Sequence, residues 1–238
     1  MAPNLIYQYY FPFTGPNKDL IEPGERGLPL WAEIGVRSGK NYADRIDVHH
    51  EFNYKTRIGA PNQNLEACRI FMDPFFDDYD KVLMLDIDTI IPTEHNIFDN
   101  EIIDMGMVQD GGPGSPQKWI KETVNKLEDY GGVTFPTSKT YFEKRYLNGG
   151  VVLWSKKGRI KAREKFGGLR EMFRYRETLQ MNEQPYLNLM INKHNMHVTE
   201  LPPEWNSMNY MWRGGEPKGK IWHFLGTSKR TMKKYHGV

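Results

Sequence analysis

The sequence contains little of several features that define whole classes of protein. Its single cysteine, Cys68, excludes an internal disulfide, a cysteine-rich zinc site and a CxxC redox motif. No run approaches the ~18 consecutive apolar residues that a transmembrane helix needs, and MAPNLIYQYYFPF has neither the basic start nor the long apolar run of a secretory signal. These absences favour a cytoplasmic globular protein in which Cys68 is a small core residue.

Net charge is also nearly absent. Lys and Arg total 32 and Asp and Glu total 30, so the formal net charge is 32 − 30 = +2. A general nucleic-acid binder is usually strongly basic, so this balance argues against nucleic acid as a partner. A chain of 238 residues with 39% apolar residues is long enough to bury a sizeable core.

The balanced total hides two opposed charge blocks. Between Asp73 and Asp104 there are ten acidic residues and one basic residue, whereas Lys156 to Arg176 contains nine basic and two acidic residues. The segment after Glu216 adds six basic residues and no acidic one. Such blocks are most often solvated faces. The alternative is one cation site and one phosphate-facing surface.

The apolar pattern alternates between strand-like and helix-like segments. Strands are expected at 5–13, from about 46–48, at 82–87, 102–108, 151–154 and 222–225, and helices at 31–44, 65–76, 160–179 and 185–192. Strands that alternate with helices predict an α/β fold. The Gly- and Pro-rich stretch 111–116 divides two halves but is too short for a flexible linker. We therefore expect a single domain over residues 1–238.

The main functional signal is YDKVLMLDIDTIIP, residues 79–92. Its apolar run predicts a strand buried on both faces, and Asp86 and Asp88 stand at the C-terminal end of that strand. Two residues apart on a strand, their carboxylates point to the same side and repel each other. Mg²⁺ or Mn²⁺ relieves that repulsion and bridges to substrate phosphates. Open α/β sheets also bind ligands at the carboxyl ends of their strands, so we expect a metal site here.

This segment has two other interpretations. A surface turn after a strand would need no metal. A DxDxT motif after an apolar strand marks phosphatases whose first aspartate is a nucleophile. Here Thr89 directly follows the second aspartate, and Ile90 stands where that motif has its threonine. The strand also lies in mid-chain, so a phosphatase is disfavoured.

Six segments in order along the chain resemble motifs of the GT-A fold glycosyltransferases. They are LEACRIFM, YDKVLMLDIDTII, YLNGGVVLWS, NEQPYLN, PPEWN and IWHFLGTSK, which together cover about residues 65–230. The resemblance is greatest to family 8, the retaining galactosyltransferase and glycogenin-like group. It implies a Rossmann-like single domain with a mixed, mostly parallel central sheet flanked by helices. About 1–110 would form the nucleotide-binding half and about 111–238 the sugar and acceptor half.

The resemblance also implies which residues bind the metal and the donor phosphates. Asp86, Asp88 and His223 would hold Mn²⁺ or Mg²⁺, and two carboxylates with one imidazole suit Mn²⁺ better than Ca²⁺. The metal would bridge the diphosphate of a UDP- or GDP-linked sugar. Arg69 would reach the donor and Lys229 would bind the diphosphate. Gly226 would let the backbone approach the phosphates.

Three further residues would act on the sugar. Asn148 carries both the amide donor and the acceptor that sugar hydroxyls need. Gln184 falls beneath the anomeric carbon, and because glutamine is a weak nucleophile, front-face attack with retention is favoured. Glu183 would position the sugar or Arg69. Pro185 replaces the second acid of the family motif, which leaves the donor sugar open.

Some positions near these motifs have two interpretations. Gly149 and Gly150 leave room for a ligand, or they allow a close strand contact. Asp110 is a weaker candidate for contact with the sugar hydroxyls. The aromatic residues Trp205, Tyr210 and Trp212 would stack on an acceptor sugar or belong to the core.

Other functions remain open at this point. An inverting transferase of the same fold would need a carboxylate base, for which Glu204 is the candidate. A sugar nucleotidyltransferase is disfavoured because FPFTGPNKDL lacks the GxGxRL pattern. A carbohydrate- or polyanion-binding module would use the basic blocks and bind no nucleotide. The partners we expect are a nucleotide-sugar and a glycan or other hydroxyl acceptor, and the oligomeric state stays open.

Overall fold

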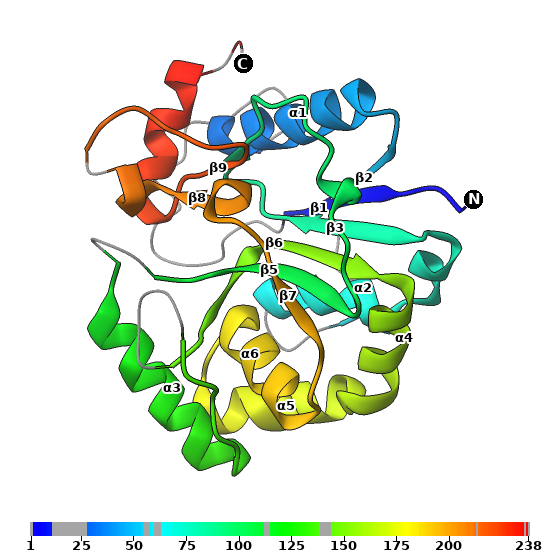
Figure 1. The fold of residues 1–238 in the computed structure, drawn as a ribbon, viewed down its shortest axis with the longest axis vertical. Helices are drawn as coiled ribbons and strands as arrows, with labels where there is room; N and C mark the ends of the chain where they lie inside the picture. Colours follow the sequence, from blue (N-terminus) through cyan, green and yellow to red (C-terminus); the bar gives the residue numbers. More distant parts are fainter. Residues whose placement is uncertain are drawn as a thin grey trace.

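A computed structural model describes residues 2–10, 28–54, 58–59, 63–111, 115–138, 144–212, 214–235 and 237. Its main sheet has six strands in the order β2-β1-β3-β6-β5-β7 (Figure 1). They are β1 (Leu5–Tyr9), β2 (His49–Asn53), β3 (Lys81–Leu85), β5 (Met105–Gln109), β6 (Leu147–Ser155) and β7 (Val198–Glu200). Strand β6 runs antiparallel to β3 and β5, and the other three pairings are parallel. The predicted mixed, mostly parallel sheet is confirmed.

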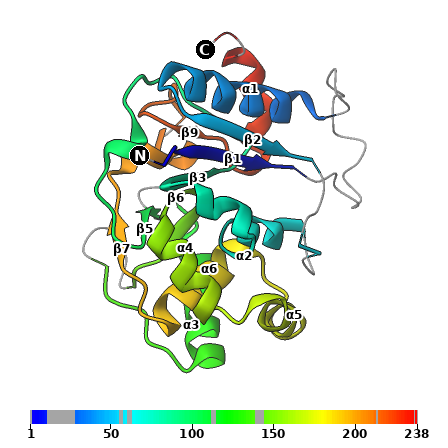
Figure 2. The same ribbon diagram turned by 90° about the vertical axis from the view of Figure 1, so that its right-hand side faces the viewer.

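Helices cover both faces of this sheet. They are α1 (Leu30–Arg45), α2 (Arg69–Met72), α3 (Gln117–Gly131), α4 (Lys156–Lys165), α5 (Gly168–Leu179) and α6 (Glu183–Lys193). Figure 2 shows α1 on one side of the sheet and the other five on the opposite side. Buried apolar residues form a core on each face because β3 alternates Val82 and Met84 toward one cluster with Leu83 and Leu85 toward the other. A strand with both faces buried is what its continuous apolar run predicts.

A small second sheet brings the C-terminal part of the chain to the end of β3. Its order is β4 (Thr89–Ile90), β9 (Trp222–His223) and β8 (Ser207–Met208). Thr89 pairs with His223 in the antiparallel β4–β9 register. Two 3-10 helices flank these strands, Pro203–Asn206 and Gly226–Tyr235. Residues more than a hundred positions apart are thus placed beside the Asp86–Asp88 turn.

Several expected elements differ in their bounds. The first strand is β1, and residues 11–13 lie outside the described part of the chain. The strand expected from Ile46–Val48 begins at His49, after a turn in which Asp47 has a φ of 53°. The helix expected at 160–179 is two helices, because Gly167, which lies between them, and Gly168, which begins α5, both have a positive φ.

The expected helix at 65–76 is wrong as a single element. The structure has a 3-10 helix at Gln63–Cys68, the one-turn α2, and a second 3-10 helix at Pro74–Asp78. Pro74 has no amide hydrogen to continue a helical ladder. Asp73 instead accepts a hydrogen bond from the Phe75 amide and caps the new segment. The sequence analysis also predicts no element at 117–131, where the structure has α3.

The two charge blocks are joined to each other through α4. Arg163 pairs with Asp77 at 2.7 Å and Lys161 with Asp104 at 2.6 Å. Arg159 is fully buried and donates to the backbone carbonyl oxygens of Trp154, Phe76 and Tyr79. These three basic residues are therefore engaged within the fold, and a phosphate-facing surface on this block stays a prediction.

Within the described part of the chain, no helix combines the length and the apolar character needed to cross a bilayer. A cytoplasmic location stays a prediction.

Candidate functional site

The turn after β3 holds the two aspartates at the carboxyl end of this central strand. Asp86 donates its amide hydrogen to the carbonyl oxygen of Gly150 on β6, at 2.8 Å. Thr89 closes the turn, because its hydroxyl donates to the carbonyl oxygen of Asp86 at 2.6 Å. The chain then enters β4, whose pairing with β9 sets His223 against the turn.

His223 meets both carboxylates. Its Nε2 atom is 3.7 Å from Asp86 Oδ2 and 3.3 Å from Asp88 Oδ1. One ligand atom from each of the three residues lies within 4.8 Å of the other two. Nε2 is buried and has no hydrogen-bond partner, so an imidazole nitrogen points at the two carboxylates without being satisfied. Two carboxylates and an unpaired imidazole nitrogen therefore fit a divalent cation such as Mn²⁺ or Mg²⁺.

Lys229 is the fourth charged group of the site. Its Nζ atom is 2.8 Å from Asp88 Oδ2 and 4.6 Å from the centre of the Trp31 ring. Gly226 begins the 3-10 helix that carries Lys229, with a φ of +60° and open space where a Cβ would lie. Glycine adopts this left-handed backbone conformation without strain. The close approach to phosphate expected of Gly226 stays a prediction.

The two aspartates have opposite electrostatic environments. Burial and the charge of Asp88 raise the pKa of Asp86 to about 6. Burial also disfavours ionisation of Asp88, but Lys229 and His223 outweigh it and hold the pKa of Asp88 well below its usual range. The site therefore has one firmly ionised carboxylate and a second that binds a proton readily, a pattern that an added cation would relieve.

Gly150 allows β6 to pass directly beneath this group. A Cβ atom at this position would lie 2.2 Å from His223 Cε1 and 2.9 Å from Asp86 Oδ2. Only glycine lets the imidazole and the carboxylate approach the strand so closely. Of the two interpretations of this residue, close packing is the one that the structure shows.

The two amide side chains expected to act on the sugar meet at Asp110. Asn148 Nδ2 donates to Asp110 Oδ2 at 3.2 Å, and Gln184 Nε2 donates to the same oxygen at 2.8 Å. The Tyr210 hydroxyl donates to the other carboxylate oxygen at 2.6 Å. Asp110 is 5% exposed, so its charge is held by three donors within the protein. Sequence reasoning placed Asp110 near the sugar but did not find that it anchors both amides.

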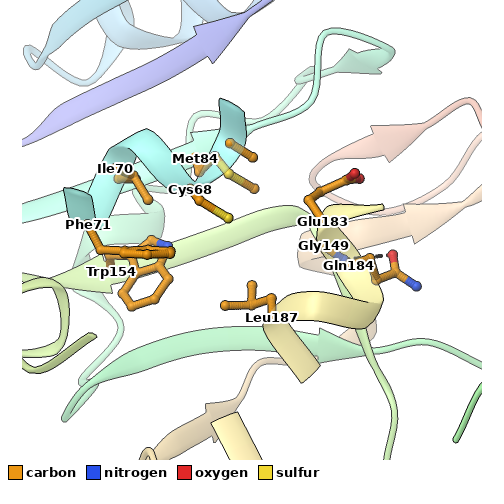
Figure 3. Close-up of a pocket in the computed structure, with 10 residues that line it drawn as sticks. Cys68, Ile70, Phe71, Met84, Gly149, Trp154, Glu183, Gln184 and Leu187 are labelled. Atoms are coloured by element: carbon orange, nitrogen blue, oxygen red, sulfur yellow. Dashed lines mark hydrogen bonds between the residues drawn. The ribbon is translucent and has the colours of Figure 1, made fainter. Parts of the chain in front are cut away.

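Glu183 begins α6 and contacts a small cavity between α2, β6 and α6 (Figure 3). Cys68, buried as expected, lines the same cavity. In Figure 3 the side chains of Glu183 and Gln184 point in different directions. Glu183 Oε2 is buried without a hydrogen-bond partner, and burial together with Asp86 raises the pKa of Glu183 to about 8.

Arg69 contacts an acidic residue and three aromatic rings. Its Nε atom donates to Asp73 at 2.8 Å, and its guanidinium packs against the rings of Tyr7, Phe75 and Phe76. The donor contact expected of Arg69 stays a prediction.

The other candidate residues have definite environments. Glu204 pairs with Lys220 at 3.8 Å. Trp205 is buried in the core, and Trp212 packs edge-on against Phe224. Asn206, to which the sequence analysis gives no role, lies between Asn148 and His223. Its only sequence signal is its place in the PPEWN segment.

The raised carboxyl pKa values give the metal-free protein a definite pH dependence. The folded-state pKa of Asp86 is about 6 and that of Glu183 about 8, both above their unfolded values. The protonated carboxyls therefore contribute their full stabilisation below the unfolded-state pKa values. That contribution is lost as the pH rises through the folded-state pKa values. We expect the ionisation of these two carboxyls to lower the free energy of unfolding between about pH 5 and pH 8, by about 1.4 kcal/mol per pH unit for each group while the pH lies between its unfolded and folded pKa values.

Thermal unfolding of wild type and Glu183→Gln across this range tests the expectation. The variant should lose much of the slope because it cannot ionise. Equal slopes for the two proteins would show that Glu183 is not the titrating group.

The structure defines a fold that known enzymes share. The chain has the GT-A fold of glycosyltransferases, with an Asp-Asp-His group at the carboxyl end of a central strand. No family model matches the sequence, and no curated protein matches it either.

Solved structures of glycosyltransferases share this fold at low sequence identity. A glycosyltransferase involved in the glycosylation of the major capsid of PBCV-1 is similar with a TM-score of 0.59 and 10% identity, covering 99% of this chain and 100% of that one. The galactosyltransferase LgtC, in complex with donor and acceptor sugar analogs, has a TM-score of 0.55 and 15% identity, covering 98% and 95%. Mouse xyloside xylosyltransferase 1 has a TM-score of 0.52 and 13% identity, covering 94% and 98%.

Proposed function

We propose that this protein is a metal-dependent glycosyltransferase. It would transfer a sugar from a nucleotide-sugar donor to a hydroxyl group of a glycan or other acceptor, with retention at the anomeric carbon. The observation that carries the proposal is the convergence of Asp86, Asp88 and His223 beside Lys229, in a fold shared with glycosyltransferases.

Asp86, Asp88 and His223 are the residues that would hold the metal. A bound Mn²⁺ or Mg²⁺ supplies positive charge that stabilises the diphosphate leaving group. Lys229 supplies a second cation beside it, since its ammonium group already lies against Asp88. UDP- and GDP-linked sugars both carry this diphosphate. The specificity for the nucleobase would depend on residues in the N-terminal part of the chain. Strand β1 pairs with β3, which leads into the Asp86–Asp88 turn, and so lies next to the proposed diphosphate site.

The sugar would lie against Asn148, Glu183 and Gln184. Asn148 and Gln184 are held rigid by Asp110, so their remaining amide donors are preorganised for hydroxyl groups. Burial and Asp86 raise the pKa of Glu183 to about 8 in the metal-free protein, so a protonated Glu183 would donate a hydrogen bond to a hydroxyl. Gln184 has no titratable proton and is a weak nucleophile. A covalent intermediate on Gln184 is therefore disfavoured. The acceptor hydroxyl would instead attack the anomeric carbon from the same face that the phosphate leaves, which retains the anomeric configuration.

The two halves of the chain would not act separately. Residues 1–110 supply Asp86 and Asp88, whereas 111–238 supplies His223 and Lys229 through β9 and the 3-10 helix that follows. The diphosphate would therefore lie between the halves, with the nucleoside over the first half and the sugar over the second.

A panel of UDP- and GDP-linked sugars, assayed with Mn²⁺, with Mg²⁺ and with a chelator, tests this function. We expect turnover or hydrolysis of at least one donor only with metal, and NMR of the product should show the donor's anomeric configuration. An inverted product would contradict retention and point to a carboxylate base such as Glu204. Metal-independent turnover would contradict the proposed function itself.

A further inference from the structure

A buried chain of side-chain amides connects His223 to the residues expected to hold the sugar. Asn206, at the end of the 3-10 helix Pro203–Asn206, is 0% exposed and lies in its middle. Its Nδ2 atom donates to Asn148 Oδ1 at 2.8 Å, and its Oδ1 atom is 2.9 Å from His223 Nδ1. One side chain therefore contacts both the imidazole of the Asp-Asp-His group and an amide that reaches Asp110.

The direction of every hydrogen bond in this chain follows from backbone groups that can only donate. The Gly150 amide donates to Asn148 Oδ1 at 2.9 Å, so this atom is an oxygen and an acceptor. Asn206 must then present its NH₂ group to that oxygen and its own carbonyl oxygen to His223. At the other end the Gly149 amide donates to Gln184 Oε1 at 2.9 Å, which turns the Gln184 NH₂ group toward Asp110.

In its neutral form, the imidazole has one possible arrangement at the end of this chain. Asn206 Oδ1 is an acceptor, so His223 must carry a proton on Nδ1. In the neutral imidazole the other nitrogen, Nε2, is then the acceptor. Nε2 is the buried, unpartnered atom that faces Asp86 and Asp88. The amide of Asn206 thus selects the tautomer that a metal ligand requires.

We propose that Asn206 is a positioning residue that serves both ends of the site. Its carbonyl oxygen fixes the tautomer and ring orientation of His223, and its NH₂ group fixes the amide of Asn148 toward Asp110. The first role concerns metal affinity and rests on the proposed function. The second concerns the orientation of the sugar-binding amide.

Two substitutions separate these roles. Asn206→Leu removes both hydrogen bonds, and loss of the outer partner of a ligating histidine typically costs ~10–100-fold in metal affinity. Asn206→Asp keeps an oxygen for His223 Nδ1 but cannot donate to Asn148. We expect it to keep the metal affinity within about threefold, because a carboxylate is also a common partner of a ligating histidine.

Asn188→Leu is the matched control. Asn188 is also 0% exposed, and its side chain bonds the backbone of Leu147 and Gln184 rather than His223. It should lower stability about as much as Asn206→Leu while leaving Mn²⁺ affinity unchanged. Calorimetric titration of each metal-free protein with Mn²⁺ alone gives the affinities, and equal Mn²⁺ affinity in Asn206→Leu and Asn188→Leu would overturn the proposal.

A second measurement does not depend on metal binding. Nitrogen NMR of the metal-free protein, at a pH above the imidazole pKa, should show the His223 proton on Nδ1 in wild type and in Asn206→Asp. A mixture of tautomers is expected in Asn206→Leu. A proton on Nε2 in wild type would overturn the inference. If wild type binds no Mn²⁺ but has the Nδ1 tautomer, the proposed function fails and the positioning of His223 by Asn206 stands.

Discussion

Asp88→Asn is expected to abolish metal-dependent donor binding and to lower turnover by about a thousandfold or more. Asparagine keeps the shape of the side chain but removes the charge that Lys229 and His223 stabilise. The loss of one anionic metal ligand removes several kcal/mol of charge stabilisation at the leaving group, and each 1.4 kcal/mol is about tenfold in rate. Steady-state kinetics at saturating Mn²⁺, together with a Mn²⁺ titration, would measure both effects.

Asp78→Asn is the control for this substitution. Asp78 belongs to the same acidic block but is exposed and lies before β3, so its loss changes the net charge equally without touching His223 or Lys229. We expect its kinetics to match wild type. Turnover of Asp88→Asn within tenfold of wild type would show that Asp88 does not bind a catalytic metal.

Arg159→Met is expected to cause the largest loss of stability in the basic block. The guanidinium is buried and donates to three backbone carbonyl oxygens, of Trp154, Phe76 and Tyr79. Burial lowers the pKa of Arg159 only to about 10, so it stays charged at neutral pH. Methionine fills much of the space but donates no hydrogen bond, although the oxygen of Phe76 keeps another donor, the Tyr79 amide. The loss should cost about 3–5 kcal/mol.

Urea unfolding gives this free energy directly. Lys157→Met is the control, because Lys157 lies on the same helix and is exposed, and we expect a change within about 0.5 kcal/mol. Mn²⁺ affinity should be unchanged in both variants while they remain folded. A loss below about 1 kcal/mol in Arg159→Met would mean that water replaces the guanidinium at those carbonyl groups.

The parts of the fold predicted from sequence are those with a continuous apolar signal. Strand β3 is a run of four apolar residues between charged ones, and both its burial and the position of Asp86 and Asp88 follow from that pattern. Helix α3 was missed although its buried residues Ile120, Val124 and Leu127 have helical spacing and Gly132 ends it with a positive φ. Polar residues around them dilute that signal.

The residues of the Asp-Asp-His group were predicted from sequence motifs. The contacts that hold these residues in place lie outside the motifs and were not predicted. The closeness of His223 to Asp86 depends on the pairing of two-residue strands, β4 with β9, which are too short to show any periodicity. The bonds of Asn206 and Asp110 depend on backbone donors of Gly149 and Gly150 that no side-chain pattern reveals. The charge pattern is limited in the same way. It predicts Arg159 and Lys161 as solvated surface charges, whereas in the structure both bond to other residues of the fold.

Calorimetric titration of the wild-type protein with UDP and GDP, with and without Mn²⁺, tests the central claim most directly. The account predicts that at least one nucleotide binds with Mn²⁺ and that a chelator abolishes this binding. It also predicts that Mn²⁺ alone binds, at a stoichiometry of about one, because a single Asp-Asp-His group of this kind is found in the described chain. Nucleotide binding of equal affinity with Mn²⁺ and with chelator would contradict it.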